Sequence, residues 1–406
     1  MTSFFRKGAI RMKVLVADKL SNKAIHELKT GGADVTFTPD LTAQALPAEI
    51  NDAEILVVRS TKVTAETITA ASSLSLIIRA GAGVNTIDLD AASNCGINVA
   101  NCPGKNTDAV AELTIGLMIA ADRRIPAAGR DLAGGKWRKK EYGKSSGLKG
   151  RTMAIIGTGR IGQAVADRAR GLKMNVIAWS RSLTPEKAEA LELGYCKTPL
   201  EAAEKADVIS VHLASTPETR HFINADFLAG MKDDSILVNT SRGEVVDTTA
   251  LKDAMAAKGI KAGLDVFEDE PAGGESNFAD TELALTAVCT PHIGASTDQA
   301  AEAIAEEVVT IVNAYRVTGK PLNVVNIRKT TSAVRTLVVR HYNRVGVLAS
   351  VLDALRSEDI NIEEMENTIL QGGQAASCVL KLDDTPSGSL LDKIRAAENI
   401  IQVSLK

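Results

Sequence analysis

Aromatic side chains are scarce in this chain of 406 residues, at 3% of the sequence. Proteins that bind single-stranded nucleic acid usually stack its bases on aromatic rings, so the composition is not typical of that class. An excess of either charge is also missing, because 47 Lys and Arg face 50 Asp and Glu, for a net charge of -3. No basic field is therefore available to attract nucleic acid or anionic lipid. We predict neither partner, and any bound anion must be held by a local pocket.

Paired cysteines and long apolar runs are missing as well. The five cysteines form no Cys-x-x-Cys pair, which predicts neither a disulfide framework nor a zinc site and fits a reducing compartment. The most apolar helix candidate, Leu113–Ala121, is too short to span a membrane. Met1–Met12 carries basic residues but no apolar core of signal-peptide length. We expect a cytoplasmic protein without a metal site, with a few disordered residues at the N-terminus.

Short β-branched runs alternate with helical patterns through most of the chain. Nearly continuous apolar strands such as Ile55–Val58 are typical of parallel sheets that helices cover on both faces. From about Val334 the rhythm changes to strand, helix, strand, strand, helix, strand. The predicted fold class is α/β, with two doubly wound parallel sheets followed by a small α+β module. The expected strands are Lys13–Asp18, Ala33–Thr38, Glu54–Arg59, Leu76–Ala80 and Ile97–Ala100, then Met153–Ile156, Val176–Trp179, Val208–Leu213, Ile236–Asn239, Gly263–Val266 and Ala287–Cys289.

A glycine-rich loop, Gly157-Thr-Gly159-Arg-Ile-Gly162, follows an expected strand and opens an expected helix. In a dinucleotide-binding turn the first glycine makes the turn and the second lets the backbone approach a pyrophosphate. The third lets the helix pack on the strand. A glycine-rich loop without a function is the alternative, and the flanking strand and helix favour the cofactor loop. No Lys-Ser/Thr pair follows, which excludes a nucleoside-triphosphate P-loop.

The end of the next strand leaves the choice of nicotinamide cofactor open. NAD-binding folds usually place an Asp or Glu about 20 residues after the glycine loop, where it binds the ribose 2′-hydroxyl. This chain has Trp179-Ser180-Arg181 there, with no carboxylate to repel a 2′-phosphate. NADP therefore stays possible beside NAD. The alternative is that Ser180 bonds the ribose weakly and that Arg181 is a solvated surface charge.

Three polar segments end strands of the same expected sheet, at the edge where open α/β sheets bind their ligands. They contain Arg242, Glu270 and His292, which are expected to meet beside the nicotinamide. This set suits hydride transfer at a 2-hydroxy acid, since His can take the hydroxyl proton, a carboxylate can orient the imidazole, and Arg can bind the substrate carboxylate. We expect His26 and His221 to be ordinary helix or loop residues and His212 to be a core residue.

The motifs GTGRIG, NTSRGEVVD, LDVFEDEP and TPHIGAST together resemble the D-isomer-specific 2-hydroxyacid dehydrogenase family. Two earlier segments, Val58-Arg-Ser-Thr-Lys-Val63 and Arg79-Ala-Gly-Ala-Gly-Val-Asn-Thr-Ile-Asp88, resemble its D-3-phosphoglycerate dehydrogenase branch. The resemblance implies a Rossmann-type NAD-binding domain, residues 106–292. This domain would be inserted in a flavodoxin-like substrate domain made of residues 1–105 and 293–325, with the active site between the two.

The resemblance also implies residue roles at the matching positions. Arg242, Glu270 and His292 match the catalytic set of the family. Asp265 matches the residue that holds the nicotinamide carboxamide, and Ser180 replaces the common ribose-binding Asp. The implied cofactor-binding residues are Gly157, Gly159, Arg160, Ile161, Gly162, Ser180, Arg181, Thr240, Ser241, Asp265, His292 and Gly294.

The implied reaction is the oxidation of 3-phospho-D-glycerate to 3-phosphohydroxypyruvate, the first step of L-serine biosynthesis. The substrate carboxylate is expected at the glycine-rich turn 81–84 and Arg242, and its phosphate at cationic and hydroxyl side chains. A solvated loop charge is the alternative for Lys62. The expected substrate-binding residues are Arg59, Ser60, Lys62, Gly81, Gly83, Val84, Asn106 and Arg242.

The last 70-odd residues, 334–406, resemble an ACT domain, a βαββαβ module that binds amino acids at subunit interfaces. His341, Asn343 and Asn361 match residues that contact L-serine there, which implies feedback by serine. A module that only holds subunits together is the alternative. A homo-oligomer, dimer or tetramer, is expected, in which the loop Trp137-Arg138-Lys139-Lys140 approaches a neighbouring subunit's site or is simply a basic surface loop.

Two other functions stay open. An NADPH-dependent hydroxypyruvate or glyoxylate reductase is favoured by Ser180 and Arg181, and the ACT-like module argues against it. Some relatives of this fold are dinucleotide-sensing transcriptional corepressors. The segment Val58–Val63 and the C-terminal module argue against that function.

Overall fold

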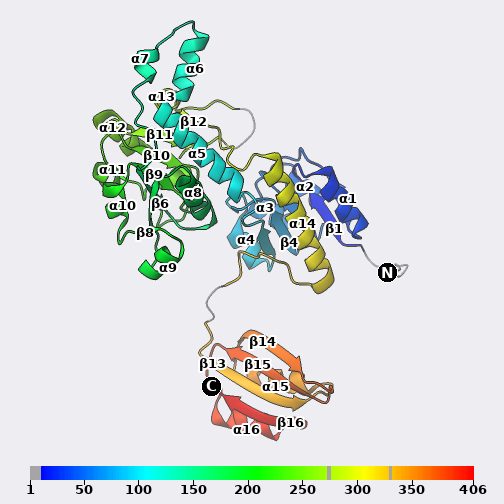
Figure 1. Ribbon diagram of the computed structural model, residues 1–406. Coiled ribbons are helices and arrows are strands. Elements are labelled where there is room, and N and C mark those ends of the chain that lie inside the picture. The colour runs from blue at the N-terminus through cyan, green and yellow to red at the C-terminus, as the bar shows by residue number, and fades with distance from the viewer. Residues whose placement is uncertain (1–10, 272–275, 329–331) are drawn as a thin grey trace. The chain divides into compact units, whose positions relative to one another are not determined.

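The computed structural model describes residues 11–271, 276–328 and 332–406 (Figure 1). The chain divides into two compact units, Met1–Asn326 and Ile327–Lys406. The expectation of disorder at the N-terminus falls on residues 1–10, outside the described ranges. Within those ranges, no helix has both the length and the apolar character that a membrane crossing needs.

The first sheet of the larger unit has five parallel strands in the order β2-β1-β3-β4-β5, the flavodoxin-like order. β3 is buried along its whole length, as its uninterrupted apolar sequence predicts. The strands are β1 (Lys13–Val16), β2 (Asp34–Phe37), β3 (Ile55–Val58), β4 (Leu76–Arg79) and β5 (Asn98–Asn101). The helices between them are α1 (Asn22–Thr30), α2 (Leu46–Glu49), α3 (Ala65–Ala70) and α4 (Leu89–Asn94).

A helix from far along the chain completes this sheet's core. α14 (Asp298–Thr318) places Ile304, Val308 and Ile311 in one buried cluster with Val14 of β1 (Figure 1). The spacing of these side chains along α14 puts them on one face of the helix. The helix that follows His292 thus returns to the N-terminal sheet, as the resemblance implies.

The second sheet has seven parallel strands in the order β12-β11-β10-β9-β6-β7-β8, which is the Rossmann order extended by one strand. Its strands are β6 (Thr152–Ile156), β7 (Asn175–Trp179), β8 (Gly194–Tyr195), β9 (Val208–Val211), β10 (Ile236–Asn239), β11 (Lys261–Leu264) and β12 (Val288–Cys289). Its helices are α5 (Thr107–Arg123), α8 (Arg160–Gly171), α9 (Pro185–Ala190), α10 (Pro199–Lys205), α11 (Ala225–Gly230), α12 (Thr248–Lys258) and α13 (Thr281–Thr286). A short 3₁₀ turn, η1 (Gly243–Val245), precedes α12.

Several expected strands extend past the ends of the observed ones. β9 ends at Val211 instead of Leu213, and β11 ends at Leu264 instead of Val266. An apolar residue, Leu213 or Val266, lies two positions after the end of each strand, and Val266 is as buried as a strand residue. Apolar character alone therefore does not reveal where the ladder of hydrogen bonds stops.

The C-terminal unit contains β13 (Arg335–Tyr342), α15 (Val347–Arg356), β14 (Ile362–Ile369), β15 (Ala375–Leu382), α16 (Gly388–Ala396) and β16 (Ile400–Leu405). Its antiparallel sheet has the order β14-β15-β13-β16. Leu337, Leu355 and Leu380 lie in its buried core beside residues of both helices. The predicted fold class, two parallel α/β sheets followed by a βαββαβ module, is confirmed.

Candidate active site

The glycine loop between β6 and α8 has the close contacts that only glycine tolerates at two of its positions. Gly157 has φ +103°, and a Cβ there would lie 2.5 Å from the carbonyl oxygen of His212. A Cβ on Gly162 would lie 2.1 Å from the carbonyl oxygen of Gly157. A Cβ on Gly159 would meet nothing within 4 Å, so open space lies over the N-terminus of α8. The donor groups and space present fit a dinucleotide pyrophosphate.

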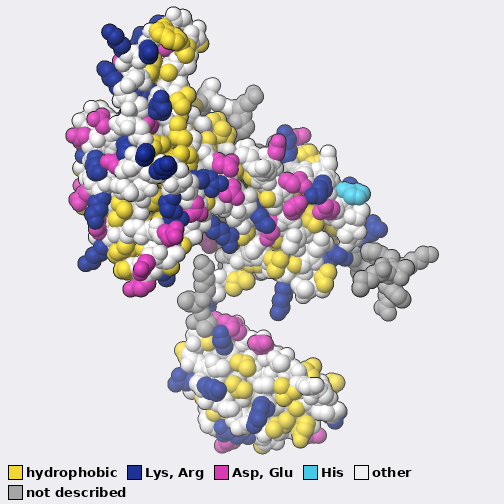
Figure 2. Space-filling view, viewed as in Figure 1, with side chains coloured by type: hydrophobic (Ala, Val, Ile, Leu, Met, Phe, Trp, Pro, Cys, Tyr) yellow, Lys and Arg dark blue, Asp and Glu magenta, His cyan; other side chains and the backbone are white. Residues whose placement is uncertain are grey.

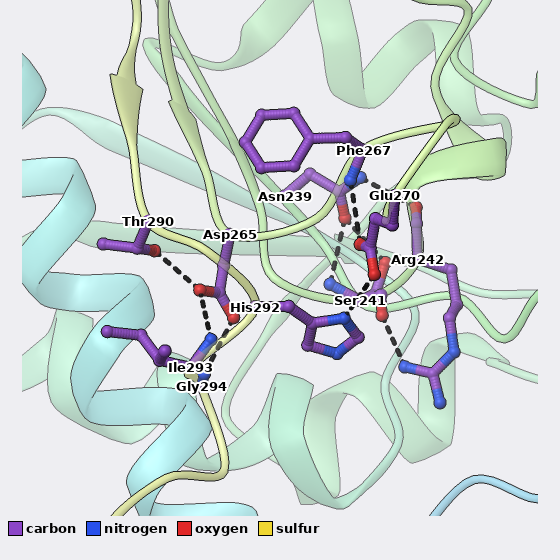
Figure 3. Close-up of polar contacts among 10 residues, drawn as sticks. All are labelled: Asn239, Ser241, Arg242, Asp265, Phe267, Glu270, Thr290, His292, Ile293 and Gly294. Carbon is purple, nitrogen blue, oxygen red and sulfur yellow. Dashed lines mark hydrogen bonds and ion pairs between the residues drawn. The ribbon is translucent and has the colours of Figure 1, made fainter. Parts of the chain in front are cut away.

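His292 and Glu270 form a hydrogen-bonded pair at the carboxyl edge of the same sheet (Figure 3). The distance between His292 Nδ1 and Glu270 Oε2 is 2.6 Å. Glu270 Oε1 accepts the backbone N–H of Phe267 at 3.0 Å. Burial by itself would raise the pKa of Glu270, but the hydrogen bonds from His292 and Phe267 outweigh it, and the pKa lies below its usual value. Glu270 is therefore an anion that orients the imidazole and leaves Nε2 free.

The buried carboxylate of Asp265 holds the segment that carries His292. Oδ1 of Asp265 accepts the Thr290 hydroxyl at 2.6 Å and the Ile293 N–H at 2.8 Å, and Oδ2 accepts the Gly294 N–H at 2.8 Å (Figure 3). His292 itself has φ +51°, an uncommon conformation for a residue with a Cβ. These three bonds stabilise that conformation. They leave acceptor capacity on Oδ2 for one further donor, such as a carboxamide.

Arg242 follows β10 in a loop that is held by the buried side chain of Asn239. The Asn239 amide donates to the carbonyl of Arg242 at 2.9 Å. Its oxygen accepts both the N–H and the hydroxyl of Ser241, at 3.0 and 2.8 Å. Thr240 is anchored separately, with 2.7 Å between its hydroxyl oxygen and that of Thr114. The guanidinium of Arg242 is thus presented from a backbone with little freedom to move.

Three guanidinium groups come together at the carboxyl edge of the first sheet. Burial and the neighbouring charges of Arg242 and Arg59 lower the pKa of Arg79. A Cβ on Gly83 would lie 2.3 Å from a terminal nitrogen of Arg242. Among the described residues, none of these three arginines forms an ion pair with a carboxylate, and Arg79 Nε is buried without a hydrogen-bond partner. Uncompensated cations this close together form an anion site.

Comparison with known proteins agrees with this geometry. Residues 115–294 match the model of the "D-isomer specific 2-hydroxyacid dehydrogenase, NAD binding domain". The D-3-phosphoglycerate dehydrogenase of Methanocaldococcus jannaschii is 42% identical over 296 residues, which cover 72% of this chain and 55% of the relative. The hydroxypyruvate reductase of Thermotoga maritima is 41% identical over 302 residues, 74% of this chain and 96% of the relative.

The chain belongs to the D-isomer-specific 2-hydroxyacid dehydrogenase family. The resemblance is therefore confirmed, and the matched segment contains the glycine loop, Ser180, Arg242, Glu270 and His292. A solved 3-phosphoglycerate dehydrogenase of Entamoeba histolytica, bound to NAD⁺, has a TM-score of 0.66 and 27% identity. The match covers 78% of this chain and 99% of that structure. The chain spans about half the length of the archaeal phosphoglycerate dehydrogenases that it matches.

The structure places the other residues that the family resemblance implies in loops and at helix ends of the larger unit. Ser180 follows β7, with 2.9 Å between its hydroxyl oxygen and that of Thr158 in the glycine loop, and Arg181 is exposed. Arg160 lies against Gly104, where a Cβ would be 2.8 Å from its guanidinium. The remaining residues are Ile161, half-buried in α8; Ser60 and Lys62, exposed after β3; Gly81, beside the guanidinium of Arg79; Val84, which lines a cleft of about 500 Å³ with Asn85 and Ser215; and Asn106, which precedes α5 without a capping bond.

His212 differs from His292 although both follow strands of the family's cofactor domain. His212 directly follows β9 instead of lying inside it, and 2.8 Å separates its Nε2 from the Ser210 hydroxyl oxygen. Burial lowers the pKa of His212 to about 4, so it is neutral near pH 7. It has no carboxylate partner, unlike His292. Of the two, only His292 has the partner that stabilises an imidazolium.

His221, expected to be an ordinary residue, forms a second His–carboxylate pair. Its Nε2 lies 2.5 Å from Oε1 of Glu268, whose Oε2 accepts the Thr248 N–H at 2.9 Å. Because Glu268 is two residues before Glu270, these two bonds tie the loop of Glu270 to His221 and to the start of α12. The sequence gives no signal for this pair, since His221 and Glu268 are 47 positions apart.

The three residues matched to a serine site lie in the C-terminal unit, and no hydrogen bond joins them there. His341 is 2% exposed, and its two ring nitrogens already contact the carbonyl of Tyr342 at 2.8 Å and Oδ1 of Asn367 at 3.1 Å. Asn343 is exposed and donates to the carbonyl of Gly373 at 3.0 Å. Asn361 is exposed and precedes β14. A ligand would reach Asn343 and Asn361 directly. It would reach His341 only if His341 gave up its contact with Tyr342 or Asn367.

Residues 11–271, 276–328 and 332–406 contain no group of three or more His, Cys, Asp or Glu side chains that could hold a metal ion.

Proposed function

We propose that the protein oxidises 3-phospho-D-glycerate to 3-phosphohydroxypyruvate with NAD, the first step of L-serine biosynthesis. The observation that carries this proposal is the cluster of Arg59, Arg79 and Arg242, none of which forms an ion pair with a carboxylate of the described residues. A substrate with an anionic group at each end would neutralise this cluster. The phosphoglycerate dehydrogenases among the relatives support the same substrate.

The side chains divide the reaction between them. His292 Nε2 takes the proton of the substrate's C2 hydroxyl, and Glu270 on Nδ1 stabilises the resulting imidazolium. Arg242 binds the carboxylate next to C2 and polarises the carbonyl that forms, while Arg59 and Arg79 bind the phosphate. Gly157–Gly162 would hold NAD, which would supply the hydride acceptor for C2. The alcohol carbon thus loses a hydride, and its oxygen loses a proton.

A hydroxypyruvate or glyoxylate reductase that uses NADPH is the second candidate. Ser180 and Arg181 favour it because they place no carboxylate at the ribose, and the hydroxypyruvate reductase of T. maritima supports it. Initial rates with phosphohydroxypyruvate and hydroxypyruvate, each with NADH and NADPH, decide between the two. The proposed function requires a higher kcat/KM for phosphohydroxypyruvate with NADH. A higher kcat/KM for hydroxypyruvate with NADPH would establish the second candidate.

Ser180→Asp is expected to increase discrimination against NADPH. A carboxylate at the end of β7 would repel the 2′-phosphate and accept a hydrogen bond from the ribose of NADH. We expect the ratio of kcat/KM for NADH to that for NADPH to rise by about tenfold or more, as a charge contact in a partly exposed site allows. Arg181→Ala is the control, because it lowers NADPH use selectively only if the guanidinium contacts that phosphate. An unchanged kcat/KM ratio in Ser180→Asp would mean that residue 180 does not contact the ribose of the cofactor.

We also propose that L-serine regulates the enzyme through the C-terminal unit, and Asn343→Ala tests this proposal. Asn343 and Asn361 are exposed polar groups suited to an amino acid. Coupling between two sites is typically about 5–150-fold if it acts on affinity. Asn343→Ala is expected to lose inhibition by serine and to keep its uninhibited kcat within about twofold, since it removes only a module contact. Steady-state rates with millimolar serine measure both, and full wild-type activity together with no heat of serine binding would contradict the proposal.

A homo-oligomer is the remaining part of the proposal. Helix α6 (Ile125–Ala133) has no buried residue, and Figure 2 shows hydrophobic and basic side chains together on the α6 and α7 (Lys139–Tyr142) segment. Leu132 and Trp137 are 57% and 81% exposed there. Large apolar side chains gathered in this way are typical of a protein interface, and a second copy of the chain is the proposed partner.

A further inference from the structure

The carboxylate of Asp18 lies in a cradle of three consecutive backbone amides. Its Oδ2 accepts hydrogen bonds from the N–H groups of Arg59, Ser60 and Thr61, at 2.7, 3.1 and 3.0 Å. Successive N–H groups that converge on one point form an anion-binding concavity. In this protein the occupant is a side chain of the protein itself.

The sheet explains how two segments 41 residues apart meet. β1 and β3 are neighbouring parallel strands, with Val16 opposite Val57, so Asp18 and the loop after β3 leave the sheet at the same edge. The loop is tied down twice more. The Thr61 hydroxyl donates to the carbonyl of Leu41 at 3.2 Å, and the N–H of Val63 donates to Thr86 at 2.8 Å.

Two side chains of this loop, those of Arg59 and Ser60, remain free for a ligand. Among the described residues, neither the Arg59 guanidinium nor the Ser60 hydroxyl has a hydrogen-bond partner. The charge of Arg59 lowers the pKa of Arg79, and the charge of Asp18 raises it. Asp18 therefore occupies the three N–H groups of residues 59–61, whereas the side chains of Arg59 and Ser60 have no hydrogen-bond partner among the described residues.

We propose that Asp18 is a positioning residue that determines recognition of the substrate's phosphate. It closes the amide cradle to the phosphate and holds the loop so that Arg59 acts together with Arg79. The phosphate is then bound by side chains instead of backbone amides. This inference rests on the proposed function, since it concerns the phosphate end of that substrate.

The charge of Asp18 and its hydrogen bonds predict opposite effects of substitution. If only the charge mattered, neutral Asp18→Asn would strengthen the attraction for an anion. If the hydrogen bonds matter, Asn offers one uncharged oxygen to three N–H groups, and Asp18→Ala offers none. The positioning role therefore predicts weaker phosphate recognition in the order wild type, Asp18→Asn, Asp18→Ala.

The test compares phosphohydroxypyruvate with hydroxypyruvate, which lacks only the phosphate, at saturating NADH. In Asp18→Ala we expect the KM for phosphohydroxypyruvate to rise by about tenfold or more, and in Asp18→Asn by less, as loss of hydrogen bonds to a charged group implies. The KM for hydroxypyruvate, the KM for NADH and kcat are expected to stay within about twofold. Ser21→Ala is the matched control, because Ser21 lies three residues after Asp18 but accepts a backbone N–H of α1 instead of the loop amides.

The possible outcomes separate this inference from the proposed function. A wild-type enzyme without preference for phosphohydroxypyruvate contradicts the proposed function. A wild-type preference that survives in Asp18→Ala contradicts only the role of Asp18. An equal rise of KM for both substrates shows a general structural role, and a lower KM in Asp18→Asn shows a pure charge effect. Both of these outcomes overturn the inference, and Asp18→Asn decides alone if Asp18→Ala does not fold.

Discussion

His292→Ala is expected to lower kcat by about 10²–10⁴-fold, the usual contribution of a positioned general acid or base. The reason is the geometry of the pair, in which Glu270 holds Nδ1 at 2.6 Å and leaves Nε2 for the substrate proton. NADH binding is expected to remain near the wild-type value, because among the described residues no hydrogen bond joins the His292 side chain to the glycine loop. Stopped-flow or steady-state rates, with NADH binding followed by fluorescence, measure both quantities.

His26→Ala is the matched control for this substitution. His26 is exposed on α1 and has no side-chain contact with the site. A wild-type kcat in His292→Ala would contradict the assignment of the proton transfer. Restored turnover with added imidazole would support it, since the free base would replace the missing side chain.

The sequence predicts the parts of the site whose chemistry is local. Gly157 and Gly159 lie between β6 and α8, and Gly162 lies in the first turn of α8, so spacing alone places them at a helix N-terminus. Arg242 and His292 each follow a strand of one parallel sheet, and parallel strands bring such residues to one edge. The fold class and the pairing of His292 with Glu270 could be predicted for the same reason.

The sequence does not predict the contacts that hold these groups in place. Asp18 and Asn239 act through backbone amides and carbonyls, which carry no residue-specific signal in the partner segment. Arg79 begins a motif that resembles the family, yet its membership in the cationic cluster depends on the spacing of β3 and β4 in the folded sheet. In the C-terminal unit, the sequence predicts the identity of a residue but not its exposure. His341 matches a serine-binding residue, yet its side chain is buried in the structure.

Gly243 offers a test of the geometry that only the fold reveals. It starts the 3₁₀ turn after Arg242, and a Cβ there would lie 1.9 Å from the backbone carbonyl group of Phe267 and 2.5 Å from the nitrogen of Glu268. Backbone atoms cannot yield as a flexible side chain would. The loop 267–270 must therefore move if residue 243 has a side chain, and Glu270 moves with it.

Gly243→Ala is accordingly expected to lower kcat by about 100-fold, the effect that a displacement of about 1 Å has on a catalytic group. Gly171→Ala is the matched control, because a Cβ on Gly171 meets nothing within 4 Å at the end of α8. Thermal melting and NADH binding distinguish a displaced loop from an unfolded protein. Glu268→Ala gives a second route, since it releases the same loop from His221 and Thr248 without a clash and is expected to lower kcat in the same direction. Wild-type kcat in folded Gly243→Ala and in Glu268→Ala would mean that catalysis does not depend on where this loop places Glu270.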